Sequence, residues 1–460
     1  MNHTKPDDTI SAMPATRRTF LTAAATAASY RRVLGANDRI QVGFIGYGLI
    51  GAEHVHDFKN QRDVDMAAMC ETYQPRLEEG VQACGGHAKA YKDFRRLLDD
   101  KDIQAVVVST PDHWHALLTI LACAAGKDVY VEKPMTLFVE EGRWMVTAAR
   151  RYKRVVQVGM QQRSGLHYQK ARELIQSGYI GQVMSARMGA YRNIMPGFGS
   201  PPDGAAPADF DYDMWLGPAP KRPYNPHRGI YHFRWFWDYS GGQMTNLGAH
   251  EIDIVQWYLG ALGPTGVSSS GGRFALEGNG ETPDTQDALF EYPHKFTSVW
   301  SHREASAGRR AGSGLEFFGT KGSLTINRGG YEVHPDMKVN PENLIPVFQG
   351  HPEGGPQRTQ TKPEPWVEAR KETGSSSQQF DLHVRNFLDC IVSRQRTIAD
   401  VEDGHRTATA CHLANISLRL GRKVKWDASK EQIVGDREAS AMLVRPYRKP
   451  WDEVLHSLKL

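Results

Sequence analysis

Residues 40–51 read Ile40-Gln-Val-Gly-Phe-Ile-Gly-Tyr-Gly-Leu-Ile-Gly51, an apolar strand that runs into the pattern Gly46-x-Gly48-x-x-Gly51. In this spacing Gly46 permits a tight turn, Gly48 lets a pyrophosphate approach the backbone, and Gly51 lets the next helix pack close to the strand. The N-terminus of that helix offers free N–H groups and the positive end of its dipole to phosphates. The stretch therefore predicts a dinucleotide site, with the neighbouring residues Tyr47, Leu49 and Ile50 beside the ligand.

An acidic residue stands where such a site needs one. Glu71 follows the β-rich run Val64–Cys70, twenty residues beyond Gly51. Its carboxylate is expected to accept hydrogen bonds from the adenine ribose, which favours NAD. NADP stays open, because Thr72 or Arg76 could accommodate a 2′-phosphate.

The length and the alternation of elements predict an α/β protein with two domains. The chain has 460 residues, more than one hydrophobic core usually serves. Strands and helices alternate over 37–160, which predicts a Rossmann domain with a parallel sheet. Residues 161–427 predict a second α/β domain, for substrate binding and oligomerisation, whose open sheet is largely antiparallel. Residues 428–460 form an aromatic and basic tail that either packs back on the sheet or completes a neighbour's site.

The first 36 residues have the form of a twin-arginine export signal. Thr16-Arg17-Arg18-Thr19-Phe20-Leu21 precedes a weakly apolar, alanine-rich run that ends at Ser29. The alternative is a disordered basic tail. The signal predicts export and a periplasmic location. No later segment reaches the roughly 18 apolar residues of a membrane-spanning helix, so no stable span is expected.

Charge and cysteine content exclude several classes of partner. The formal net charge is +4, and the leader supplies most of it, so no nucleic-acid partner is expected. The five cysteines have no metal-binding spacing, so no metal site is predicted. A chain that folds before export also needs no disulfide framework.

The stretch Ser109-Thr-Pro-Asp-His-Trp-His115 follows a strand at the expected carboxyl edge of the sheet. Open α/β sheets bind ligands at this edge. We therefore expect four of its residues beside the cofactor: Thr110, Pro111, His113 and His115. The competing interpretation is a proline turn and a helix cap.

Glu132-Lys133-Pro134 ends the next strand. A lysine here would lie near the positive ring of an oxidised nicotinamide, which lowers its pKa and suits it to proton exchange with a hydroxyl. Glu132 and Lys133 are therefore expected to contact the cofactor, and Lys133 to be catalytic. The alternative is a solvated lysine at the end of a strand.

A third group of polar residues runs from Gly241 to Asp253. Asn246 is expected to cap a helix, with His250 one turn inside it and Asp253 at i+3, where a carboxylate can orient the imidazole. The alternative for His250 is a core histidine. Candidate sugar contacts, each equally compatible with a structural role, are Arg163, Tyr191, His232, Arg234, Trp235, Asn246 and Asp253.

Taken together these motifs resemble the glucose–fructose oxidoreductase, inositol dehydrogenase and rhizopine-catabolism family (Gfo/Idh/MocA). The resemblance covers about residues 38–427 and includes Val158–Arg163 and Trp215–Pro218. It implies a Rossmann domain followed by an α/β domain that often builds a dimer or tetramer. It also implies that Lys133 contacts the reacting hydroxyl, that Pro134 follows a cis peptide, and that His250 is a general acid/base. Asn246 departs from the family, many of whose members have an aspartate there.

The expected reaction is oxidation of a hydroxyl on a sugar, cyclitol or glycoside with tightly bound NAD(P). An exported enzyme has to carry its cofactor and restore its redox state in each turnover. The first alternative is a redox-neutral NAD-dependent glycoside hydrolase, which oxidises C3, eliminates the aglycone and returns the hydride. The second is a non-catalytic protein that binds a dinucleotide or a sugar.

Overall fold

The computed structural model describes residues 39–293, 295–308, 312–338 and 364–459. The predicted export signal at 1–36 lies outside the described residues. From Ile40 onward the chain forms one compact unit that contains two large sheets and a small two-stranded one.

The first sheet is parallel throughout and has the strand order β3-β2-β1-β4-β5-β6. Its strands are β1 (Ile40–Ile45), β2 (Val64–Cys70), β3 (Lys89–Tyr91), β4 (Ala105–Val108), β5 (Asp128–Val131) and β6 (Val156–Val158). The helices between them are α2 (Leu49–Lys59), α3 (Gln74–Ala83), α4 (Phe94–Asp99), α5 (Asp112–Ala124) and α6 (Val139–Arg151). Every residue of β4 and β5 is buried, as expected when helices cover both faces of a parallel sheet. The predicted Rossmann sheet is confirmed, and its strand order reverses between β1 and β4, where such folds bind ligands.

The second sheet has ten strands in the order β16-β15-β14-β13-β7-β12-β11-β9-β17-β18. The strands are β7 (Val183–Tyr191), β9 (Gly266–Gly272), β11 (Thr285–Glu291), β12 (Thr297–Arg303), β13 (Gly312–Gly319), β14 (Gly322–Asn327), β15 (Gly330–Pro335), β16 (Arg370–Thr373), β17 (Val424–Asp427) and β18 (Gln432–Ile433). Only β7 and β12 pair in parallel, so the prediction of a largely antiparallel sheet is confirmed.

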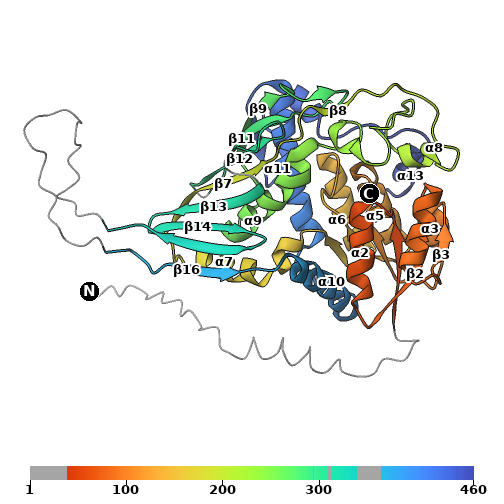
Figure 1. Ribbon diagram of the computed structural model, residues 1–460, viewed down its shortest axis with the longest axis horizontal. Helices are drawn as coiled ribbons and strands as arrows, with labels where there is room; N and C mark the ends of the chain where they lie inside the picture. The colour runs from red at the N-terminus through yellow and green to blue at the C-terminus, as the bar shows by residue number, and fades with distance from the viewer. Residues whose placement is uncertain (1–38, 294, 309–311, 339–363, 460) are drawn as a thin grey trace, which may run out of the picture. The chain divides into compact units, whose positions relative to one another are not determined.

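Helices cover one face of this second sheet. Buried and half-buried residues alternate along β12, which is the pattern of a strand with one face in a core. The covering helices are α7 (Leu166–Gln176), α9 (Ala249–Leu259) and α11 (Val401–Leu420) (Figure 1). The opposite face carries the exposed apolar side chain of Leu289, which alternates along β11 with the buried Ala288 and Phe290.

Two segments from the C-terminal part of the chain pack on the first domain. Residues 335–380 include β16 and the start of α10 (Ser376–Ser393), while residues 339–363 lie outside the described part. Helix α10 runs beside α2 (Figure 1). Its stripe of Val384, Phe387 and Leu388 shares a core with β1 of the first sheet.

The tail packs back at two places: its strand β18 extends the ten-stranded sheet, and its last helix packs on helices of the first domain. It contains α12 (Arg437–Ala441) and α13 (Trp451–Ser457). The Trp451 ring lies 4.9 Å from that of Trp114 and 6.0 Å from that of Phe94, between ring centroids. The Tyr447 hydroxyl donates a hydrogen bond of 2.8 Å to Glu141.

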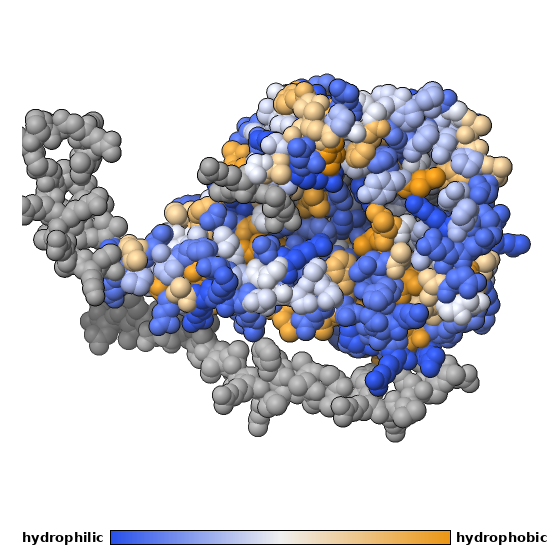
Figure 2. Space-filling model, in the orientation of Figure 1, coloured by the Kyte–Doolittle hydropathy of each residue, from blue (hydrophilic) through white to orange (hydrophobic). Residues whose placement is uncertain are grey.

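On the face drawn in Figure 2, hydrophobic side chains are scattered in small groups among hydrophilic ones. No helix of the described residues is long and apolar enough to cross a membrane. All five cysteines are buried as free thiols.

Candidate functional site

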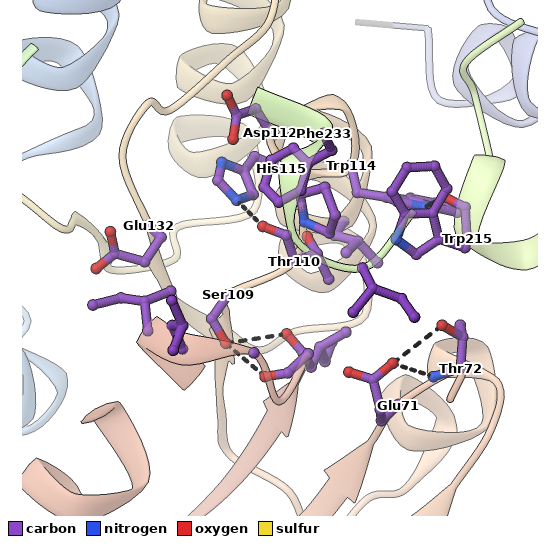
Figure 3. A pocket seen from close by; sticks show the side chains of 18 of the residues that line it. Glu71, Thr72, Ser109, Thr110, Asp112, Trp114, His115, Glu132, Trp215 and Phe233 are labelled. Carbon is purple, nitrogen blue, oxygen red and sulfur yellow. Dashed lines mark hydrogen bonds between the residues drawn. The ribbon is translucent and has the colours of Figure 1, made fainter. Parts of the chain in front are cut away.

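A cavity of about 410 Å³ opens at the carboxyl ends of β1, β4 and β5. Figure 3 shows side chains from both domains around it. From the first domain come residues of the glycine loop, the loop after β4 and the end of β5. The second domain contributes Phe210, Met214, Trp215, Ile230, Tyr231, Phe233, Arg234, Ser240 and Asn246.

The three glycines do what their spacing predicts. Gly46 has φ +95°, and a Cβ there would lie 2.9 Å from the Ser109 carbonyl carbon. A Cβ on Gly51 would lie 2.4 Å from the Gly46 oxygen, so only glycine lets α2 pack this close to the turn. A Cβ on Gly48 would meet nothing closer than 3.8 Å. The backbone at Gly48 is therefore open to the cavity, and the loop fits the diphosphate of a dinucleotide.

Glu71 is fixed by backbone donors at the far side of this loop (Figure 3). Its carboxylate accepts from the N–H groups of Tyr47 at 2.9 Å, Thr72 at 2.7 Å and Tyr73 at 3.1 Å. A carboxylate held in this way can accept from ribose hydroxyls, as predicted. The cations Arg76 and Lys92 line the same cavity, so the lining carries groups suited to either NAD or NADP.

Two histidines expected beside the cofactor, His113 and His115, lie in the first turn of α5 and have different partners. The ring nitrogens of His115 lie 2.7 Å from the Pro134 oxygen and 2.8 Å from the Thr110 oxygen, which ties two ligand-facing loops together. His113 instead lies 2.9 Å from the Trp215 oxygen and does not line the cavity. Burial lowers the pKa of His113 to about 3, so its ring is neutral and joins the two domains through this hydrogen bond. The expectation of a cofactor contact therefore fails for His113, because residues two apart on a helix point to opposite sides.

Glu132 is a buried carboxylate whose oxygens are used within the protein. One oxygen lies 2.7 Å from both His54 Nε2 and Gln161 Nε2, and the other accepts from the Lys133 N–H at 3.0 Å. Burial works to raise its pKa, but the hydrogen bond and charge of His54 outweigh burial and leave the pKa lowered. Glu132 therefore fixes the end of β5 and positions Lys133.

Lys133 lies between the two domains at the end of β5 and precedes a cis peptide to Pro134. Its amine donates to the Asn246 backbone oxygen at 3.0 Å and to Asn246 Oδ1 at 3.1 Å. Burial lowers the pKa of Lys133 to about 8, and the positive charges of Arg234 and Arg328 contribute to the lowering. A lysine with this pKa can both accept and release a proton near neutral pH.

Asn246 reaches the lysine from a π-helical turn, Met244–Gly248, rather than from a helix cap as expected. Such a turn inserts an extra residue, and π-turns are frequent at functional sites. The turn runs directly into α9.

His250 lies in the first turn of α9 and is buried. Burial lowers its pKa well below the ordinary value, and the charges of Lys133 and Arg328 act in the same direction. Its Nε2 faces Arg328 Nη2 at 3.4 Å, while Nδ1 has no hydrogen-bond partner among the described residues. The imidazole is therefore neutral at physiological pH.

Asp253 does not orient His250, which corrects the expectation drawn from their spacing. Both carboxylate oxygens of Asp253 are held by Arg163 at 2.8 Å, and Thr407 donates to one of them at 3.1 Å. Arg163 belongs to the turn η2 (Gln161–Ser164), far away in sequence, so local spacing could not reveal this partner. Both members of the pair are buried, and neither lines the cavity.

Of the other residues expected to contact the sugar, some line the main cavity and others lie elsewhere. Arg234 and Asn246 line the main cavity. Tyr191 lies in a groove on the ten-stranded sheet, His232 packs on Phe198, and Trp235 donates to Glu304 at 2.9 Å. Sequence reasoning missed Tyr73 and Phe210 in the aromatic wall of this cavity, because single aromatic residues in loops carry no spacing signal.

The structure places no group of three or more His, Cys, Asp or Glu side chains that could hold a metal ion within the residues it describes.

Comparison with family models identifies both domains. Residues 40–160 match the model of the oxidoreductase family with an NAD-binding Rossmann fold (Gfo/Idh/MocA). Residues 165–269 and 371–453 match that family's C-terminal alpha/beta domain, and residues 220–325 match a further Gfo/Idh/MocA C-terminal domain model.

Individual proteins show the same relationship at lower coverage. Inositol 2-dehydrogenase of Salmonella typhimurium is 29% identical over 147 residues, which are 32% of this chain and 44% of that enzyme. A glycosyl hydrolase family 109 protein of Shewanella pealeana is 37% identical over 125 residues, covering 25% of this chain and 27% of that protein. The chain thus spans less than half the length of the curated relatives it matches. An oxidoreductase domain protein from Kribbella flavida shares the fold, with a TM-score of 0.65 and 19% identity over 86% of this chain and 100% of the other.

Proposed function

Because the chain belongs to the Gfo/Idh/MocA oxidoreductase family, we propose that it is an NAD(P)-dependent oxidoreductase that oxidises a hydroxyl of a sugar, cyclitol or glycoside. The observation that carries this proposal is the position of Lys133. Its amine, with a pKa of about 8, lies on the wall of the same cavity that the backbone of Gly48 faces. The inositol dehydrogenase relative supports the substrate class.

The proton step follows from the contacts of Lys133. A neutral amine has two N–H groups, and the two oxygens of Asn246 accept both of them. Its lone pair is then free to take the proton of a substrate hydroxyl. The hydrogen on the adjacent carbon leaves with its electron pair, which is the transfer that a bound nicotinamide supports, and a carbonyl forms.

His250 is the second proton-handling group of the proposal. Its imidazole is neutral, so one ring nitrogen can accept a hydrogen bond. This nitrogen is Nε2, which faces the donor Arg328 Nη2. Lys133 is the stronger base of the two, since the pKa of His250 lies well below 6.5 and that of Lys133 is about 8.

A redox-neutral glycoside hydrolase is the second candidate. Two observations favour it: the uncharged Asn246 in the position of the expected aspartate, and the similarity to glycosyl hydrolase family 109 proteins. The same Lys133 would open the reaction, and the hydride would return after the aglycone leaves.

We also propose that the protein is exported by the twin-arginine route to the periplasm and acts as a homo-oligomer. The Arg17-Arg18 pair supports the first part. The exposed apolar residue Leu289 on the uncovered sheet face supports the second.

The first experiment identifies the nucleotide released by denaturing the purified protein and follows 340 nm absorbance of the native sample with sugars and aryl glycosides. Stable reduction that a second carbonyl substrate reverses supports the oxidoreductase. Aglycone release without lasting reduction supports the glycosidase instead. Lys133→Ala should abolish either reaction while the nucleotide stays bound, and a fully active variant would contradict both mechanisms.

A further inference from the structure

Three cationic side chains converge on the region where the proposed reaction occurs. Lys133 enters from β5, Arg234 from the turn η3 (His232–Trp235), and Arg328 from the connection between β14 and β15. Arg234 lines the main cavity, and Arg328 Nη2 reaches to 3.4 Å from His250 Nε2. Both guanidinium groups lie close enough to Lys133 to lower its pKa.

Neither arginine forms an ion pair with a carboxylate of the described residues. Arg234 donates to the Tyr231 oxygen at 3.3 Å and lies over the Phe233 ring at 4.6 Å. Arg328 lies over the Phe380 ring at 5.6 Å. By contrast, the deeply buried Arg163 has a bidentate carboxylate partner. Arg234 faces the cavity and Arg328 faces His250 without such partners, so both guanidinium groups are suited to an anion supplied from outside.

The acidic residues nearby are not ion-pair partners of the two arginines. Glu132 is committed to His54 and Gln161, and Asp112 accepts from Ser240. Glu251 forms no ion pair, and burial raises its pKa to about 7, so a large part of it is uncharged near neutral pH. Asn246 adds no negative charge where an aspartate was expected. An oxidised nicotinamide beside Lys133 would add a further positive charge.

This inference rests on the proposed function and concerns its substrate class. We propose that the substrate is an acidic carbohydrate, a sugar that carries a carboxylate, and that Arg234 and Arg328 bind this group. Guanidinium matches a carboxylate with two parallel hydrogen bonds, which neutral sugars cannot provide. The bound carboxylate would also favour the protonated form of Lys133, the form that exists after the hydroxyl proton is taken.

The test compares matched sugars with the holoenzyme. Glucose, glucuronate and glucose 6-sulfate form one set, and galactose, galacturonate and galactose 6-sulfate form another; cofactor reduction at 340 nm gives kcat/KM. We expect at least one uronate to exceed its neutral partner by about 10- to 100-fold, the range of a charged hydrogen-bonding pair. Equal rates for neutral and acidic partners would overturn the inference. Preference for the sulfate ester over the uronate would overturn the carboxylate assignment.

Variants then locate the binding groups. Arg234→Gln and Arg328→Gln should each raise KM for the preferred uronate by about 10-fold or more relative to KM for the neutral partner sugar, with the nucleotide still bound. Arg328→Lys should recover part of the loss. Arg187→Gln is the matched control, because Arg187 lies over Phe318 on the ten-stranded sheet, outside the cavity lining. A uniform loss for acidic and neutral sugars would mean a structural role.

Calorimetric titration of glucuronate and galacturonate into the holoenzyme separates this inference from the proposed function. If no sugar reduces the cofactor but a uronate binds and both glutamine variants weaken its binding, the oxidoreductase proposal fails and the acidic site stands. If neither uronate binds and neither is turned over, the acidic-substrate inference is overturned.

Discussion

At the scale of single residues, Asn246 sets the chemistry of Lys133. Its two oxygens hold the amine in place, yet the side chain brings no charge that would stabilise the ammonium form. A carboxylate at this distance would do so, and nearby opposite charges shift a pKa by about 1–3 units. The uncharged amide therefore helps to keep the pKa of Lys133 at about 8.

Asn246→Asp should move the pH dependence of alcohol oxidation to higher pH. Lys133 must be unprotonated to take the hydroxyl proton, so the rate rises with pH through its pKa, about 8 in the natural protein. A carboxylate beside the amine raises that pKa, so the rise should shift upward by about one unit or more. The measurement is kcat against pH. Asn193→Asp, which adds the same charge on an exposed loop, should leave the profile unchanged. An unshifted profile in Asn246→Asp would contradict the role given to Lys133.

Some residues of the site could be assigned from sequence because their neighbours in the chain define their role. Gly46, Gly48 and Gly51 follow from their spacing alone, and the structure gives each the predicted function. Asp253 was misassigned because its partner, Arg163, is ninety residues away. Arg328 could not be found at all, since nothing near it in sequence indicates that a strand connection reaches His250.

At the scale of elements, the same difference between local and distant information applies. The β-rich run Thr297–Arg303 and the helical spacing of Val384, Phe387 and Leu388 are local sequence signals of β12 and α10. The π-turn at 244–248 was not predicted, because asparagine before a helix is typical of an ordinary cap. The turn matters for function, since it places Asn246 against Lys133.

The buried ion pair between Arg163 and Asp253 joins η2 to α9. Arg163→Met would leave Asp253 as an unpaired charge at 1% side-chain exposure. Removing one member of a buried pair destabilises a protein by about 3–5 kcal/mol. Denaturant unfolding should show a loss of this size, whereas Arg95→Met, which breaks the exposed pair with Asp93, should cost less than about 1 kcal/mol. Equal losses in the two variants would show that the buried pair contributes no special stability.

At the scale of the whole molecule, two segments from the C-terminal part of the chain pack on the first domain. No local sequence pattern could predict this packing. Helix α10 lies within the sequence of the second domain and the tail follows it, but both share cores with the first domain. The sequence shows apolar residues at helical spacing in α10 and in the tail. It does not show which surface they pack against, because that surface forms only in the complete fold. The cavity is likewise completed by residues from both domains, which links cofactor retention to the integrity of the whole chain.

Retention of the cofactor leads to the last prediction, which concerns export. Twin-arginine substrates cross the membrane folded, so the protein should load its nucleotide before it leaves the cytoplasm. Arg17→Lys with Arg18→Lys keeps the charge but removes the guanidinium pair, and it should trap holoenzyme in the cytoplasm. Cell fractionation with nucleotide analysis of each fraction measures this, and Arg31→Lys with Arg32→Lys is the matched control. Unchanged export of the first variant would contradict the signal, whereas periplasmic protein without nucleotide would contradict loading before export.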